Sequence, residues 1–313
     1  MDSNIRSLHH VTATVAGAQD DLDFYVGVLG QRLVKKTVNF DNPGVYHFYY
    51  GNERGTPGTI MTTFPYAGMG VREGRQGVGQ ITVTSFSAPA AALGFWRSRL
   101  AERSVPFVDE STAFGEDAIA FVDPSGLVVR IVGAKSDPRA PWTGADVPAE
   151  HAIRGIHGVS LLVREPVTTI ALAIELLDGA VVAETEGHTR VGIGGDAPGQ
   201  LLEIVRAAGQ PGAVNGLGTV HHVAFAAAAD AQQLAVQAEL RHRGMHVTDV
   251  LDRQYFRSIY FREPNGVLFE VATVPPGFAV DEPVAQLGRA LKLPPWEEPR
   301  RAAIEAVLPP VAY

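Results

Sequence analysis

Two histidine pairs carry the residue types best suited to chemistry in this chain. His9-His10 lies near the start of the 313 residues, and His221-His222 opens the last third. Each pair is followed by a short apolar run and a helix-like stretch, and the second repeat ends in the strand-like segment 266–270, whose last residue is Glu270. Two imidazoles and one carboxylate on one face of a metal leave its other positions open, which is the ligand set of non-haem Fe(II) oxygenases. The chain has no cysteine, so nitrogen and oxygen must hold any metal here.

The elements that would position these residues recur four times. Apolar spacing near 3.6 predicts helices, and alternating β-branched runs predict strands, in the order strand, helix, strand, strand, strand. This order predicts an α+β fold. In the first unit we expect strands at 8–16, 31–39, 45–51 and 58–65 and a helix at 18–29; the other units span 79–133, with a helix at 88–102, then 156–207 and 219–274.

Two further stretches divide the chain. The Pro-rich residues 134–142 indicate a linker or surface crossing. The tail after residue 274 is expected to pack against the body and to carry one short helix. The predicted division is therefore an N-terminal pair of units at 1–135, a C-terminal pair at 150–280 and a tail at 281–313.

Aligning the four units tests the metal hypothesis. The first-strand position holds His10, Gln80, Gly158 and His222 in the four units, and the last-strand position holds Thr62, Arg130, Glu203 and Glu270. Only the first and fourth units together supply two histidines and one glutamate. His157 aligns one residue early, with His9 and His221, so strand alternation should point its ring elsewhere. Glu203 is interpreted as a vestige of a second site.

Three strings give the chain a resemblance to a known family. They are 8–12 (LHHVT), 33–40 (LVKKTVNF) and 255–264 (YFRSIYFREP), and the likeness extends over about residues 5–300. The chain resembles the vicinal oxygen chelate superfamily, which includes glyoxalases and extradiol dioxygenases, and most closely its hydroquinone-type ring-cleaving dioxygenases. The resemblance implies four βαβββ units that form two curved mixed-sheet bowls, and an assembly in which the first unit pairs with the fourth around one bowl.

The resemblance also implies a function and a site. The activity would be Fe(II)-dependent ring cleavage of hydroquinone or a substituted hydroquinone, with a small aromatic substrate and O₂ as partners and Mn(II) as the alternative ion. The implied metal ligands are His10, His222 and Glu270. Around them, Tyr260 would hydrogen-bond the bound substrate oxygen, Arg253 would offset negative charge, His9 and His221 would exchange protons, and Thr12 would contact the substrate. The other histidines outside this pattern, His47, His151, His188, His242 and His246, are interpreted as structural or exposed.

Two other functions fit the same scaffold. A glyoxalase-like lyase or isomerase usually needs a fourth protein ligand, for which Thr62 is a weak candidate. A metal-free protein that binds small molecules would not need the two-histidine, one-glutamate set. Oxygen uptake and metal content would separate the three functions.

The composition of the chain indicates which classes of binding partner are not expected. With 26 Lys and Arg against 34 Asp and Glu, the formal net charge is −8 and no basic stripe is present, so nucleic acid is not expected as a partner. No apolar run approaches the roughly 20 residues that span a bilayer, and the N-terminus lacks an export pattern. We therefore expect a cytoplasmic protein without a membrane partner, and a homo-oligomer is left open.

Overall fold

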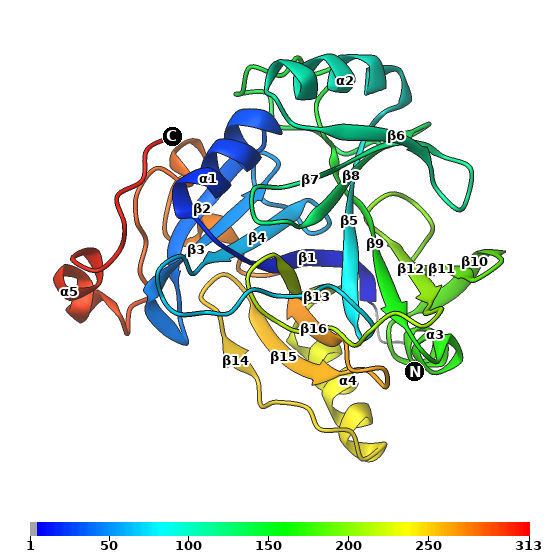
Figure 1. The fold of residues 1–313 in the computed structure, drawn as a ribbon. Helices are drawn as coiled ribbons and strands as arrows, with labels where there is room; N and C mark the ends of the chain where they lie inside the picture. Colours follow the sequence, from blue (N-terminus) through cyan, green and yellow to red (C-terminus); the bar gives the residue numbers. More distant parts are fainter. Residues whose placement is uncertain (1–4) are drawn as a thin grey trace.

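The computed structural model describes residues 5–313, and its strands form two eight-stranded mixed sheets (Figure 1). Each predicted unit is present, and in each one the first strand runs parallel to the last while the other pairs are antiparallel. The first unit comprises β1 (Ile5–Val15), α1 (Ala18–Leu22) continued by a π-helical turn (Asp23–Val28), β2 (Arg32–Asn39), β3 (Asn42–Gly51) and β4 (Ile60–Pro65). The second comprises β5 (Gln80–Pro89), a 3-10 turn (Ala90–Ala92), α2 (Leu93–Glu102), β6 (Phe107–Ser111), β7 (Asp117–Val122) and β8 (Val128–Ala134).

The third unit comprises β9 (Gly155–Val163), α3 (Pro166–Leu176), β10 (Gly179–Thr185), β11 (His188–Ile193) and β12 (Leu201–Arg206). The fourth comprises β13 (Thr219–Ala227), α4 (Asp230–His242), β14 (Leu251–Asp252), β15 (Arg257–Arg262) and β16 (Leu268–Thr273). One sheet has the order β14-β15-β16-β13-β1-β4-β3-β2, and the other has the order β10-β11-β12-β9-β5-β8-β7-β6.

The sheet order confirms the expected pairing of units. Antiparallel pairing of β1 with β13 joins the first unit to the fourth, and pairing of β5 with β9 joins the second to the third. Each sheet therefore takes strands from both halves of the chain. The predicted division of the chain into an N-terminal pair of units at 1–135, a C-terminal pair at 150–280 and a tail at 281–313 stays a prediction.

The predicted helix at 18–29 has the expected position but a different second half. Its first turn is α-helical, and Asp23–Val28 form a π-helical turn. Phe24 and Tyr25 are both buried there.

A buried polar network lies under this helix. The carboxylate of Asp21 accepts hydrogen bonds from the Tyr50 hydroxyl at 2.6 Å and from Thr63 at 2.5 Å. Tyr25 stacks on Tyr50 and donates to Asp123 at 3.3 Å. Burial raises the pKa of Asp21 to about 7 and that of Asp123 to about 6.

The linker and the tail both pack on the body. Arg139 of the linker donates to the Gly58 carbonyl at 2.6 Å and to the Ile156 carbonyl at 2.8 Å, which ties the linker to the turn before β4 and to β9. The tail contains 3-10 turns at Phe278–Val280, Val284–Gln286 and Glu298–Arg300 and the short helix α5 (Arg301–Glu305), as expected. Fully buried Lys35 of β2 holds the tail through Asp281 at 2.6 Å and Glu282 at 2.5 Å.

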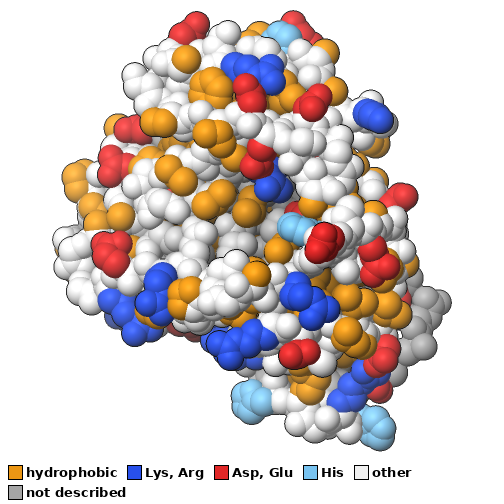
Figure 2. Space-filling model, turned by 45° about the vertical axis from the view of Figure 1, so that its right-hand side comes forward, with side chains coloured by type: hydrophobic (Ala, Val, Ile, Leu, Met, Phe, Trp, Pro, Cys, Tyr) orange, Lys and Arg blue, Asp and Glu red, His pale blue; other side chains and the backbone are white. Residues whose placement is uncertain are grey.

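The surface carries both signs of charge. On the face in Figure 2, Lys and Arg side chains alternate with Asp and Glu and with hydrophobic side chains. Within residues 5–313, no helix has the length and apolarity needed to cross a membrane.

Candidate metal centre

Both histidine pairs sit at irregularities in the strand pairing. The register between β1 and β13 runs from Leu8–Phe225 directly to His10–Ala224, and from Thr12–His222 directly to Ala13–Val220. His9 and His221 are therefore the skipped residues of β-bulges. A bulge re-aims side chains that would otherwise alternate, so the two rings of each pair approach one another instead of facing opposite sides of the sheet.

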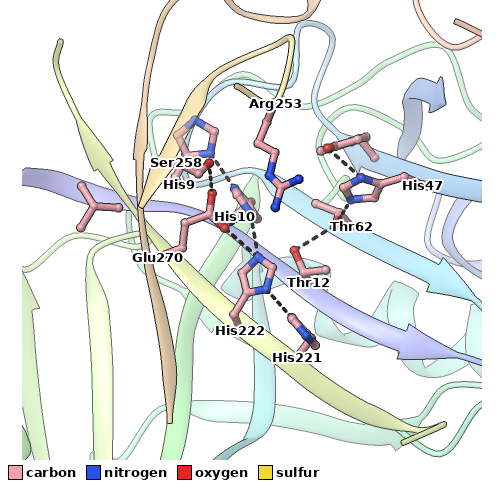
Figure 3. A network of polar contacts seen from close by, with 12 residues as sticks. His9, His10, Thr12, His47, Thr62, His221, His222, Arg253, Ser258 and Glu270 are labelled. Carbon is pink, nitrogen blue, oxygen red and sulfur yellow. Dashed lines mark hydrogen bonds and ion pairs between the residues drawn. The ribbon is translucent and has the colours of Figure 1, made fainter. Parts of the chain in front are cut away.

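The structure brings His10, His222 and Glu270 together as the sequence predicted (Figure 3). The Nε2 atoms of His10 and His222 lie 3.2 Å apart, and the Oε2 atom of Glu270 lies 3.3 Å from the first and 2.8 Å from the second. All three residues are buried. Strands β1, β13 and β16, which are neighbours in the first sheet, supply one residue each.

The donor set fits a metal ion. Three ligands at about 2.1 Å on one face of an octahedral ion are about 3.0 Å from one another, which matches the three distances above. The Oε2 atom of Glu270 is buried and has no hydrogen-bond partner. Burial would raise the pKa of Glu270, but His10 and His222 lower it well below its usual range, whereas burial lowers the pKa of His222. An ionised carboxylate facing a neutral imidazole is a suitable ligand pair for a cation.

The remaining ring nitrogens are held by the bulge histidines. His9 Nδ1 lies 2.9 Å from His10 Nδ1, and His221 Nδ1 lies 2.7 Å from His222 Nδ1. Burial, and then the neighbouring histidine, lower the pKa of His9 and of His221 to about 3. Neutral rings at these positions can fix the tautomer and orientation of His10 and His222. Only His221 of the two lines the cavity described below.

Ser258 completes the support of Glu270, and the sequence reasoning missed it. Its hydroxyl donates to the Oε1 atom of Glu270 at 2.5 Å, while Oε2 faces the histidines. Ser258 precedes Tyr260 by two residues on β15, and Tyr260 pairs with Glu270. The period-2 alternation of that strand could have indicated that both side chains face the site.

A cavity of about 330 Å³ opens over the centre. This volume is near the lower end for small-molecule sites. Its wall includes the predicted residues Thr12, Arg253 and Tyr260, and its apolar part includes Phe40, Phe64, Phe256 and Leu268.

Arg253 and Tyr260 stand together on this wall. The Arg253 guanidinium lies 5.4 Å from the centre of the Tyr260 ring, and it binds Asp41 at 3.0 Å. Burial opposes the charge of Arg253, but Tyr260 and Asp41 raise its pKa above the usual value. Burial also raises the pKa of Tyr260, so its hydroxyl stays protonated at neutral pH. The wall therefore offers a fixed cation and a hydroxyl donor.

His47 also lines the cavity, a position that the sequence analysis did not foresee. Its Nε2 atom lies 2.8 Å from the Thr62 hydroxyl, and its Nδ1 atom lies 2.9 Å from the Tyr49 hydroxyl. His47 and Tyr49 are two residues apart on β3 and share one face. Their spacing was visible in the sequence, but the cavity on that face was not.

The second bowl has a different chemistry. Arg130 occupies its last-strand position, and its guanidinium lies 3.8 Å from Glu203. Glu203 also accepts from Ser160 at 2.7 Å. His157 is skipped in the register between β5 and β9, a bulge that strand alternation did not predict, and its Nε2 atom lies 3.1 Å from Glu116. His188 Nδ1 also lies 3.1 Å from Glu203, so this carboxylate faces a guanidinium and one imidazole. Among the described residues, the only group of three with metal-ligand geometry is that of the first bowl.

Comparisons with known proteins agree with this architecture. The model of the Glyoxalase/Bleomycin resistance protein/Dioxygenase superfamily matches residues 7–131 and 155–271. The chain is 44% identical over 304 residues to "Putative ring-cleaving dioxygenase MhqE" of Bacillus subtilis, covering 96% of this chain and 98% of that protein. It is 36% identical over 308 residues to "Chlorohydroquinone/hydroquinone 1,2-dioxygenase" of Sphingobium indicum, covering 95% and 94%. The crystal structure of a "putative dioxygenase" from Bacillus subtilis matches with a TM-score of 0.93 and 43% identity, covering 98% of both chains.

Proposed function

The chain belongs to the Glyoxalase/Bleomycin resistance protein/Dioxygenase superfamily, and we propose that it is a ring-cleaving dioxygenase that uses Fe(II) and acts on hydroquinone or a substituted hydroquinone. The observation that carries this proposal is the convergence of His10, His222 and Glu270 at one end of an aromatic-lined cavity. Relatives named as ring-cleaving dioxygenases support the reaction class, and the relative named as a hydroquinone dioxygenase supports the substrate class.

His10, His222 and Glu270 would hold the metal, and Mn(II) is the alternative ion. A bound Fe(II) supplies the electron pathway that lets triplet O₂ react with a singlet aromatic ring. Three protein ligands leave room for the substrate and O₂. His9, His221 and Ser258 would hold the ligands in one orientation, because each contacts a ligand atom that faces away from the common point.

The cavity wall supplies the remaining functions. Tyr260 would donate a hydrogen bond to a substrate oxygen, because its hydroxyl stays protonated. Arg253 would stabilise the negative charge that develops on the ring. Phe256 and Phe64 would pack against the ring and exclude water. Thr12 would contact the substrate directly from β1.

A glyoxalase-like activity is less well supported. Such a site would need a fourth protein ligand, and Thr62 occupies that position. Its hydroxyl is instead engaged by His47 at 2.8 Å and by Thr12 at 3.0 Å. The side chain is therefore already used within the wall.

The test is anaerobic reconstitution with Fe(II), followed by oxygen-electrode assays on hydroquinone, chlorinated and methylated hydroquinones, and catechol. We expect uptake near one O₂ per hydroquinone, lost in His10→Ala and Glu270→Ala. Ser160→Ala in the second bowl is the control and should retain activity. Stoichiometric metal binding without oxygen uptake would contradict the proposal and favour the lyase.

A further inference from the structure

A row of hydrogen bonds crosses three neighbouring strands beside the candidate metal centre (Figure 3). In the strand register, Thr12 of β1 pairs with Thr62 of β4, and Thr62 pairs with Tyr49 of β3. The Thr62 hydroxyl lies 3.0 Å from that of Thr12 and 2.8 Å from His47 Nε2, and His47 Nδ1 lies 2.9 Å from the Tyr49 hydroxyl. We call these four residues the polar row.

Counting protons limits the polar row to two arrangements. Burial first, and then the nearness of His10 and His222, lower the pKa of His47 well below its usual value, so the ring is neutral. The row then has four protons, one on each of three hydroxyls and one on the imidazole, and three contacts that use one proton each. One proton is left over.

The His47 tautomer decides where this proton lies. With the proton on Nε2, His47 donates to Thr62, Thr62 donates to Thr12, and Tyr49 donates to Nδ1, so the free hydroxyl proton is on Thr12. With the proton on Nδ1, every bond reverses and the free proton is on Tyr49. In either arrangement one of the two end hydroxyls, Thr12 or Tyr49, has a free proton to donate to a ligand. The other end hydroxyl can only accept a hydrogen bond from it.

Both ends of the polar row line the same cavity as the metal centre. Thr12 follows His10 by two residues without a bulge between them. Its side chain therefore lies on the same face of β1, about 6.8 Å further along the strand. This spacing is comparable with the length of an aromatic ring that carries oxygen atoms at opposite ends. Thr62 itself does not line the cavity.

We propose that the polar row binds the substrate oxygen that the metal does not hold, and that it selects rings with an oxygen substituent opposite the metal-bound one. The tautomer of His47 adapts the row to the ligand: a hydroxyl can donate to one end, and an ether oxygen can accept from it. Thr62 is a positioning residue, because it acts through Thr12 and His47. This inference rests on the proposed function, since it concerns the same cavity and its aromatic substrate.

Thr62→Val tests the polar row, because it keeps the shape of the side chain and removes the central hydroxyl. Anaerobic calorimetry on the Zn(II)-loaded protein would measure binding of hydroquinone, 4-methoxyphenol and 4-methylphenol. We expect the wild type to bind the two dioxygenated rings more tightly than 4-methylphenol. In Thr62→Val that preference should fall about three- to tenfold, the size of one neutral hydrogen bond. Binding of 4-methylphenol should not change, and Thr62→Ser should restore the preference.

Thr84→Val is the matched control. Thr84 is buried on β5 of the other sheet, and its hydroxyl has no partner. We expect this variant to bind all three ligands as the wild type does. A preference that is absent in the wild type, or unchanged in folded Thr62→Val, would overturn the inference.

A second readout is independent of ligand affinity. In ¹⁵N-histidine spectra of the Zn(II)-loaded protein, the His47 nitrogen shifts report the tautomer. We expect them to change in Thr62→Val, and to differ between the complexes with hydroquinone and 4-methoxyphenol. Identical shifts in all these states would overturn the inference. Failure of the proposed function would instead appear as absent oxygen uptake on hydroquinone by the Fe(II)-loaded wild type.

Discussion

Replacing Ser258 by alanine should weaken metal binding without unfolding the protein. The Ser258 hydroxyl is the hydrogen-bond donor to the Oε1 atom of Glu270, at 2.5 Å in a fully buried site. A hydrogen bond to a charged group contributes about 1.5–3 kcal/mol. Without it, Glu270 loses the contact that holds its other oxygen toward His10 and His222.

The same interaction sets the size of the expected effect. If most of it is lost in the metal-bound state, the Kd for the metal should rise about 10- to 100-fold, which is the range for residues that orient metal ligands. Competition with a chelator of known affinity would measure Kd for wild type and Ser258→Ala, with Mn(II) and with anaerobic Fe(II). Circular dichroism and urea unfolding would show that the variant folds.

The second bowl provides a matched control. Ser160 donates to Glu203 at 2.7 Å, so Ser160→Ala removes a similar bond from a carboxylate that faces Arg130 instead of two histidines. It should lower stability to a similar extent and leave the metal Kd unchanged. Equal metal affinity in wild type and Ser258→Ala, or an equal loss in both variants, would refute the reasoning.

Three further predictions concern stability. Lys35→Met should lower the free energy of unfolding by about 3–5 kcal/mol, because it leaves two carboxylates of the tail without their buried cation; urea titration would measure this, and a loss no larger than that of the exposed-pair variant Arg241→Met, about 1 kcal/mol or less, would contradict it. Burial raises the pKa of Asp21 from 3.8 to about 7, so the native state keeps a proton that the unfolded chain loses, and the contribution of Asp21 to the free energy of unfolding falls as the pH rises from about 4 to 7, opposite to the contribution of buried, neutral His9 and His221. Urea titrations across this range should give a free energy of unfolding that falls less, or rises more, with pH in Asp21→Asn than in the wild type; equal slopes would show that Asp21 is not protonated in the folded protein. Metal at a hundredfold excess over its Kd should stabilise the wild type by about 2.7 kcal/mol, measured as a rise in Tm that a chelator reverses; an equal rise in Glu270→Gln would place the binding site elsewhere.

The sequence predicted those parts of the molecule that depend on local pattern and on repetition. Apolar periodicity located the four units, and equivalent positions in them identified His10, His222 and Glu270 as residues that would meet. The pairing of the first unit with the fourth followed from the same comparison and the family resemblance. The ligand positions need only residues within each unit and the assumption that the units superpose.

Features that depend on how strands align with their neighbours were not predictable. The contact of His9 with His10 requires a bulge, and strand alternation alone predicts opposite faces. The place of His47 in the cavity depends on the registers of β1, β3 and β4 together. Compensation of Glu203 by Arg130 depends on the meeting of the second and third units, which no single segment encodes.

The pairing of the first unit with the fourth also determines the order in which the two sheets can form while the chain is synthesised from its N-terminus. His10 and His222 are 212 residues apart, so at about 5–20 residues per second the ribosome needs roughly 10 to 40 s to deliver the second after the first. During that time β1 has an unpaired edge, although it is almost entirely buried in the finished protein. The second and third units, which adjoin in sequence, can close their sheet first. A nascent chain can therefore complete the sheet of the second and third units before the sheet that carries the candidate metal centre, and a product truncated before His222 lacks the full set of candidate ligands.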